Sequence, residues 1–271
     1  MYSKKILQAL FFLFLLFLGV FSFIANTSSS SSLDLVIENK QLLTKQIKTA
    51  PINLVVHHSK NATKKVRFKL DSLLKRIHKR HDFHGAILVA KNKKIVYQNQ
   101  IGTADFKSKT PLNKESVFQL ASVSKQFTAA AIMLLQQRNQ LKLTDTINRY
   151  FPDFPYKAVT IKTLLNHTAG LPKYFWIAEH KWQQKKAPSN NEMMELLTTS
   201  KVQRFFKPGR NFDYSNTGYF VLASIVEKIS GISFSSFLKQ NIFEPLQMKN
   251  SYVYSFENDS IRDNQLDGYR L

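Results

Sequence analysis

The chain has 271 residues, of which 44% are hydrophobic, 13% aromatic and 21% charged. This is enough apolar material for one sizeable core but not for several domains, and it excludes disorder as the main state. Lysine and arginine number 39 against 18 acidic residues, a formal net charge of +21, so anionic lipid, nucleic acid and cell-wall polymer have to be considered as partners. Cysteine is absent, which excludes disulfides, thiolate metal sites and a lipidated N-terminal cysteine.

The N-terminal segment is suited to a membrane. Lys4 and Lys5 precede an uncharged run over residues 6–25 that contains six phenylalanines. As a helix this run would be about 30 Å long, the thickness of the hydrocarbon core. We expect residues 1–25 to be a signal peptide or an N-terminal transmembrane anchor, and the length of the run favours the anchor. Because the two lysines stay inside, the rest of the chain is expected to be exported.

Two locations follow for the exported part. It is either anchored in the inner membrane through residues 6–25, facing the periplasm or exterior, or secreted to the periplasm. Both locations disfavour nucleic acid as the basic partner.

A Ser-rich and basic tether is expected over residues 26–68. It starts with a hydroxyl run and lacks any sustained hydrophobic period. Residues 40–94 hold 15 lysines and arginines but only two acidic residues, Asp71 and Asp82. The charge indicates either attraction to anionic headgroups or wall polymers, or a solvated tether and helix face, and we favour the second interpretation.

The first elements expected after the tether are a helix and a hairpin. Residues 68–81 carry apolar side chains at 70, 73, 74 and 77, the spacing of one helical face, with lysines and arginines opposite. Residues 85–90 and 95–101 are short β-prone stretches separated by a polar break, Lys91 to Lys94. We therefore predict an amphipathic helix followed by two antiparallel strands.

Helices dominate the rest of the chain. Residues 121–135 are rich in alanine, leucine and methionine, without glycine or proline, and predict a buried helix that begins near Ser122. Further helices are predicted over residues 193–197 and 219–229, the latter closed by Gly231. The predicted class is α+β, an antiparallel sheet with a mainly helical region.

Ser122 and Lys125 form an S-x-x-K tetrad. At helical spacing the lysine amine lies beside the serine hydroxyl, and a neutral amine in that place can accept the serine's proton. Residues 72–75 and 236–239 have the same spacing, so the tetrad alone is weak evidence. Context separates them, because Ser122 opens a predicted buried helix whereas the other two serines lie inside helices.

Tyr214 and Asn216 supply a second set of polar groups. A tyrosine near a lysine can be driven toward phenolate and act as a general base, and an asparagine amide can hold a substrate carbonyl. Residues 97–99 repeat the triplet within a predicted strand. By itself the pattern is better explained by a half-buried tyrosine and a loop asparagine.

Two further clusters contain side chains that could form sites. His78, His81 and His84, with Asp82, would attract attention as zinc ligands, but position 84 rotates off the helical face of the other two, so a solvated helix end is favoured and no metal is expected. An aromatic cluster could line a substrate cleft or pack as core or lid; its members are Tyr174, Trp176 and Trp182.

Taken in order, a series of segments resembles the signatures of the serine β-lactamase-related family, which includes class C β-lactamases, D-alanyl-D-alanine carboxypeptidases and related esterases. The segments are residues 118–128, 164–171, 208–209, 214–219 and 230–231. The resemblance covers about residues 70–271, and we assign residues 69–271 to a serine hydrolase domain with the β-lactamase/transpeptidase-like fold.

The resemblance implies a role for each polar residue. Ser122 is the acylated nucleophile, Lys125 its proton partner, Tyr214 the general base and Asn216 the substrate-orienting amide. The backbone N–H of Ser122 supplies half of an oxyanion hole. No cofactor is implied, and the expected substrate is a small molecule or a peptidoglycan-derived peptide. The oligomeric state is not indicated.

Three other residues of these segments are expected to shape the backbone. The resemblance includes His167 in an H-T-x-G-L segment, where we expect it to fix a turn and not to take part in catalysis. Gly170 and Gly209 are expected at positions with unusual backbone angles.

One departure from the family concerns the end of the chain. Family members continue beyond the Tyr214 motif through a strand bearing K-T-G or H-x-G, which provides the other oxyanion N–H, whereas this sequence ends at Leu271. We therefore expect an incomplete domain that lacks the C-terminal strands of its sheet. The leading hypothesis is an exported serine hydrolase acting on an amide or ester through an acyl-enzyme. The alternative is a non-catalytic remnant or ligand-binding module of the same fold.

Overall fold

A computed structural model describes residues 57–58, 64–254 and 266 of the chain. The expected signal peptide or anchor over residues 1–25 and most of the expected tether lie outside the described residues. Helix α2, Lys64–His81, begins four residues before the predicted start and ends where predicted. All of its lysines and arginines are exposed, as expected for a solvated basic face.

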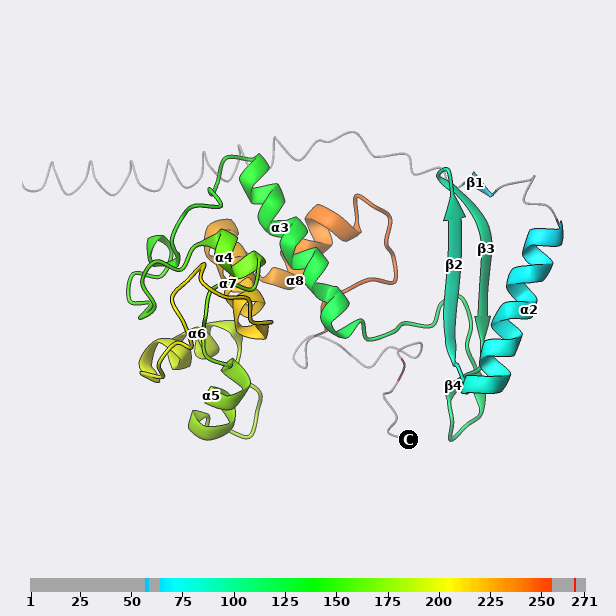
Figure 1. Cartoon of the computed structure of the whole chain (residues 1–271), viewed down its shortest axis with the longest axis horizontal. Helices are drawn as coiled ribbons and strands as arrows, with labels where there is room; N and C mark the ends of the chain where they lie inside the picture. Colours follow the sequence, from blue (N-terminus) through cyan, green and yellow to red (C-terminus); the bar gives the residue numbers. More distant parts are fainter. Residues whose placement is uncertain (1–56, 59–63, 255–265, 267–271) are drawn as a thin grey trace, which may run out of the picture. The chain divides into compact units, whose positions relative to one another are not determined.

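The predicted hairpin is confirmed (Figure 1). Strands β2, Gly85–Lys91, and β3, Lys94–Ile101, pair antiparallel from Gly85 opposite Ile101 to Lys91 opposite Lys94. The turn residues Asn92 and Lys93 both have positive φ, 51° and 61°, the combination of a type I′ turn whose twist matches that of the strands.

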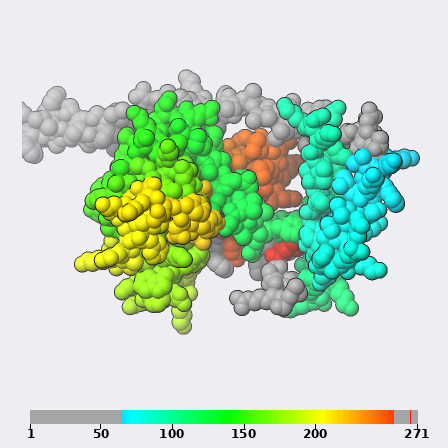
Figure 2. All heavy atoms as spheres, viewed as in Figure 1, coloured from blue at the N-terminus to red at the C-terminus, as the bar shows by residue number. Residues whose placement is uncertain are grey.

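Helix α2 covers one face of this hairpin. Its buried Leu74 belongs to the side that packs against β3, and the hydroxyl of Tyr97 on β3 donates to the carboxylate of Asp71 at 3.2 Å. Figure 2 shows the atoms of α2 and of the hairpin packed side by side. Strand β1, His57–His58, adds a short parallel pairing to β3, so the strand order is β1-β3-β2.

A second sheet follows directly. It consists of two short strands, β4, Thr103–Asp105, and β5, Thr110–Pro111, which pair antiparallel. The sequence did not predict it, because a strand of two or three residues is too short to show a period of two.

The helical region is arranged around helix α7, Asn216–Ser230, which contains the predicted helix over residues 219–229. Four helices pack against it: α3, Lys125–Gln137; α4, Ile161–Leu165; α6, Asn190–Thr199; and α8, Phe234–Leu238. Residues 221–226 of α7 are buried at every position, because neighbours cover the helix on all sides. It ends where predicted, at Gly231, which has a φ of 71°.

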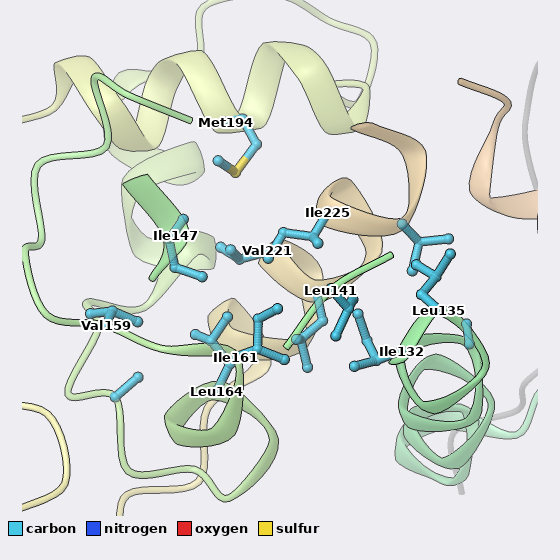
Figure 3. Packing of buried hydrophobic residues seen from close by; sticks show 14 of the residues in the cluster. Ile132, Leu135, Leu141, Ile147, Val159, Ile161, Leu164, Met194, Val221 and Ile225 are labelled. Atoms are coloured by element: carbon cyan, nitrogen blue, oxygen red, sulfur yellow. The ribbon is translucent and has the colours of Figure 1, made fainter. Parts of the chain in front are cut away.

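One hydrophobic core joins these helices (Figure 3). Its side chains come from α3, α4, α6, α7, α8 and other segments of the helical region, and those labelled in Figure 3 lie around Val221 and Ile225 of α7. Burial of this kind contributes about 1.5–3 kcal/mol for each large aliphatic side chain. The core therefore holds α3 and α7, whose N-terminal ends carry the polar residues of interest, in a defined relation to each other.

The remaining helices are short or capped locally. Thr160 is the N-cap residue of α4 and Ser189 that of α6, and each forms a capping box that satisfies two backbone donors. The helical region also contains helix α5, Tyr174–Lys181, the 3-10 helix η2, Ile147–Arg149, and the π-helical turn η3, Lys239–Phe243. In the described part of the chain no single helix has the length and apolar composition of a membrane span; α7 with residues 234–243 passes only as a pair bent by 79°.

Candidate active site

Ser122 lies in a 3-10 helix, η1, Ala121–Ser124, which leads directly into α3. In a 3-10 helix the side chains at i and i+3 eclipse each other, so Lys125 stands over Ser122. The ammonium of Lys125 donates a hydrogen bond to the Ser122 hydroxyl, with Nζ and Oγ 3.2 Å apart. The structure therefore brings the two residues of the tetrad into contact.

The predicted buried helix with Ser122 near its beginning is found as η1 followed by α3, which has four buried residues. Ser122 is exposed, and burial along the helix starts only at Thr128. The residue before it, Ala121, has a φ of 46°, in the left-handed region that costs a non-glycine residue about 1 kcal/mol or more. The sharp turn at Ala121 sets the serine hydroxyl at the surface, and strained backbone of this kind is common at functional sites.

Asn216 reaches the same lysine from α7. The hydroxyl of Ser215 caps this helix by accepting from the N–H of Gly218, which makes Asn216 the first helical residue. Its Oδ1 accepts a hydrogen bond from Nζ of Lys125 at 2.6 Å. The two residues are 91 positions apart in sequence, and the packing of α3 against α7 brings them together.

Tyr214 completes the group. Hydrogen bonding from Lys125, and secondly from Ser122, lowers the pKa of the Tyr214 phenol below its ordinary value of 10.0. Nζ of Lys125 lies 4.9 Å from the centre of the Tyr214 ring. All four residues predicted to act in catalysis or substrate binding therefore share one site.

The lysines of the other two S-x-x-K tetrads, Lys75 and Lys239, contact different partners. Nζ of Lys75 lies 2.8 Å from the carboxylate of Asp71, and Nζ of Lys239 lies 3.9 Å from that of Glu244. No ion pair found among the described residues involves Lys125. Its ammonium is therefore directed at a hydroxyl and an amide, and at no carboxylate in this part of the chain.

The segment that begins at His167 supports the loop that carries Tyr214. Three backbone hydrogen bonds join residues 167–170 to residues 205–213: Phe205 N to Gly170 O at 2.8 Å, Gly209 N to Thr168 O at 2.8 Å, and Asp213 N to His167 O at 2.9 Å. This agrees with the expectation that His167 fixes a turn. Both glycines expected to have unusual angles do so, with φ of 69° at Gly170 and 81° at Gly209.

Gly170→Ala is expected to destabilise the protein strongly. A Cβ at this position would overlap the carbonyl oxygen of Phe206, in addition to the strain of a left-handed φ. We expect the free energy of unfolding, measured by urea denaturation, to fall by about 3 kcal/mol. Gly209→Ala is the matched control, because its φ is also positive but no atom lies within 4 Å of the added Cβ, so about 1 kcal/mol is expected. Equal losses in the two variants would contradict this account.

Two residues beside the site, Thr217 and Tyr219, were not singled out from the sequence. Thr217 is buried, donates to the carbonyl of Pro172 at 2.7 Å and accepts from the N–H of Tyr174 at 2.9 Å, which ties the start of α7 to the start of α5. The ring of Tyr219 lies 5.7 Å from Nζ of Lys125. The available signal was their position within the motif over residues 214–219.

In the aromatic cluster, the side chain of Tyr174 is packed and that of Trp176 is exposed. The ring of Tyr174 is half-buried, stacked on Phe175 at 4.2 Å between centroids and packed against Phe220. Trp176 is 47% exposed, and the indole N–H of Trp182 donates to the carbonyl of Lys186. Only Tyr174 of the three predicted residues has a contact that connects it, through Thr217, to the site.

The histidine cluster has local partners. Nδ1 of His78 lies 2.8 Å from the carbonyl oxygen of Phe83, and His84 contacts the carboxylate of Asp82 through Nε2 and the N–H of Thr103 through Nδ1. Within the described ranges, no group of three or more His, Cys, Asp or Glu side chains is arranged to hold a metal ion.

Comparison with known proteins places this geometry in a family. Residues 70–270 match the sequence profile of the family described as Beta-lactamase. Penicillin-binding protein 4* of Bacillus subtilis (strain 168) is 40% identical over 189 residues, which are 70% of this chain and 42% of that protein. The chain thus spans less than half the length of this relative.

Solved structures agree with the expected α+β fold. A penicillin-binding protein from Bacillus halodurans superposes with a TM-score of 0.64 at 28% identity, covering 72% of this chain and 60% of that one. D-amino acid amidase from Ochrobactrum anthropi superposes with a TM-score of 0.57 at 29% identity, covering 67% and 52%. The shared fold and the match over residues 70–270 lead to one conclusion: the chain belongs to the beta-lactamase family, whose members are serine hydrolases and penicillin-binding proteins.

Proposed function

We propose that the chain is an exported serine hydrolase that forms an acyl-enzyme on Ser122 from an amide or ester. The observation that carries the proposal is the position of the Lys125 ammonium, which contacts the Ser122 hydroxyl and the Asn216 amide and lowers the pKa of the Tyr214 phenol. A serine hydroxyl is a weak nucleophile unless a base lies next to it. The phenolate of a tyrosine with a lowered pKa is such a base.

In the first step Oγ of Ser122 attacks the substrate carbonyl carbon while the Tyr214 phenolate takes the hydroxyl proton. The carbonyl π electrons move onto oxygen, and we assign the stabilisation of that charge to the N–H of Ser122, which is among the first backbone donors of η1. Collapse of the tetrahedral intermediate breaks the bond to the leaving group, which receives the proton from Tyr214. The product is an ester on Ser122.

In the second step water attacks the carbonyl carbon of that ester while the Tyr214 phenolate takes a proton from the water. The bond from that carbon to Oγ of Ser122 then breaks, Oγ receives the proton from Tyr214, and the acid is released. The ammonium of Lys125 stabilises the phenolate and the departing serine oxygen. Because Oδ1 of Asn216 accepts from Lys125, the amide is oriented by that bond, and its N–H donors are the groups that would bind a substrate carbonyl.

The substrate class is proposed from the relatives. Penicillin-binding proteins and D-amino acid amidase share the fold, so we propose a peptidoglycan-derived peptide, a β-lactam or a small amide or ester. Incubation with a fluorescent penicillin and, separately, with a nitrophenyl ester tests this. The expected results are a covalent label with the first and a burst of nitrophenolate with the second. Absence of both would contradict the proposal and support the alternative, a ligand-binding module without catalysis.

Export and anchoring are proposed from the sequence run over residues 6–25. A location outside the inner membrane suits the peptidoglycan-derived substrates, and the exposed lysines and arginines of α2 suit a surface rich in anionic groups. Protease added to intact spheroplasts is expected to digest the described domain while a cytoplasmic marker stays intact. Protection of the domain until the cells are lysed would contradict export.

A further inference from the structure

Tyr214 is flanked by two hydrogen bonds to a single residue, His167. On one side, the N–H of Asp213 donates to the His167 carbonyl oxygen at 2.9 Å. On the other side, the N–H of Ser215 donates to the His167 ring at Nδ1, 3.1 Å away. The backbone before and after Tyr214 is thus held by the same histidine, which leaves the tyrosine little freedom to move away from Lys125.

The imidazole ring of His167 also contacts the tyrosine side chain. Its centroid lies 4.6 Å from that of Tyr214 with 34° between the ring planes, and 5.1 Å from that of Tyr219 with 31°. The φ of His167 is 57°, a left-handed backbone angle that turns the chain so that both its carbonyl and its ring face the Tyr214 loop. His167 therefore orients the phenol through its ring as well as through the backbone.

The bond from Ser215 sets the protonation state of the ring. A backbone N–H can only donate, so Nδ1 must be unprotonated and the proton of the neutral ring lies on Nε2. The charged and titratable groups facing the ring are Lys125 from α3, Asp213, and the phenols of Tyr214 and Tyr219. Burial, and then the Lys125 charge, lower the pKa of His167 below its ordinary value of 6.5.

We propose that neutral His167 is a positioning residue that holds the Tyr214 phenol beside Lys125 and Ser122. The inference deepens the proposed function and rests on it, because it assigns a task to a residue that does not touch the reacting atoms. When His167 is protonated, Nδ1–H and the Ser215 N–H are both donors, so their bond is lost and a second positive charge lies near Lys125.

The test measures the rate at which a fluorophosphonate, which reacts with activated serines, labels Ser122. His167→Ala is expected to slow labelling about 100-fold, because displacement of a catalytic group by about 1 Å costs about that much. His167→Asn is expected to recover about tenfold of that loss, since its Oδ1 can accept from Ser215 and asparagine tolerates a positive φ. Gln247→Ala is the matched control, because Gln247 is exposed, has a φ of 55° and lies outside the site, so normal labelling is expected.

The pH dependence separates positioning from a merely structural role. The ratio of the wild-type to the His167→Asn labelling rate is expected to be constant above about pH 7 and to fall as the pH decreases to about 5, because only the wild type has a titrating ring here. The inference would be overturned if the wild type is labelled and His167→Ala is labelled at the same rate. It would also be overturned if the ratio of the wild-type to the His167→Asn rate does not change with pH. Either result would leave the proposed function intact. Absence of labelling in the wild type would instead count against the proposed function. If His167→Ala does not fold, the pH dependence of the ratio between the wild-type and His167→Asn labelling rates still tests the inference.

Discussion

Ser122→Ala is expected to lower the rate of fluorophosphonate labelling and of ester hydrolysis by at least about 10³-fold. The variant removes the oxygen that forms the covalent bond, and among the described residues Lys125 donates to no other serine or threonine hydroxyl. Because Ser122 is exposed in a 3-10 turn, the loss of one hydroxyl is expected to leave the thermal unfolding temperature nearly unchanged. Activity and stability are therefore expected to separate in this variant.

The chain supplies its own controls for this substitution. Ser72 and Ser236 stand in tetrads of the same spacing, but their lysines, Lys75 and Lys239, lie beside carboxylates. Ser72→Ala and Ser236→Ala are expected to label at the wild-type rate. A loss in either variant comparable with that of Ser122→Ala, or residual labelling in Ser122→Ala within tenfold of the wild type, would contradict the assignment.

Lys125→Met is expected to lower the labelling rate by about 10²–10⁴-fold, the range for removal of a group that assists proton transfer. Methionine keeps an unbranched apolar stem but removes the ammonium that contacts Ser122, Asn216 and the Tyr214 phenol. Since Lys125 is the largest cause of the lowered pKa of Tyr214, that pKa is expected to rise toward 10.0 in the variant. The labelling rate, which increases with pH as the phenolate forms, should then increase only at higher pH than in the wild type.

Ultraviolet titration of tyrosinate checks this shift. The signal of Tyr214 is the difference between each protein and the same protein carrying Tyr214→Phe. Lys75→Met is the matched control, because Lys75 has the same tetrad spacing but pairs with Asp71. If the Tyr214 titration is the same in the wild type and in Lys125→Met, the lysine does not activate the phenol and this part of the mechanism is wrong.

Local signals made parts of the fold predictable. The hairpin followed from two β-prone stretches around a polar break, and the C-terminal end of α7 followed from Gly231, because both depend on a few adjacent residues. The 3-10 turn at Ser122 did not follow. It depends on the left-handed φ of Ala121, and alanine gives no sign of that conformation because it strongly favours the ordinary helix. Short elements such as α4 and α5 were missed for lack of a full hydrophobic period.

In the candidate site, too, the sequence motifs were predictable, but the contacts between distant segments were not. Ser122, Lys125, Tyr214 and Asn216 were named from ordered motifs, and the structure brings them together through the packing of α3 against α7. The hydrogen bonds of His167 to the two neighbours of Tyr214 span 46 and 48 residues of sequence and involve backbone groups. No residue type encodes such a contact, so it could be found only in the folded chain.

Peptide mass mapping after fluorophosphonate treatment tests the central claim most directly. The account predicts one added phosphonyl mass per chain, located by fragmentation on Ser122, and its absence when the chain is denatured before treatment, because activation depends on Lys125 and Tyr214 being held beside the hydroxyl. A modification on Ser72, on Ser236 or on any residue other than Ser122, or equal modification of the folded and denatured chain, would contradict it.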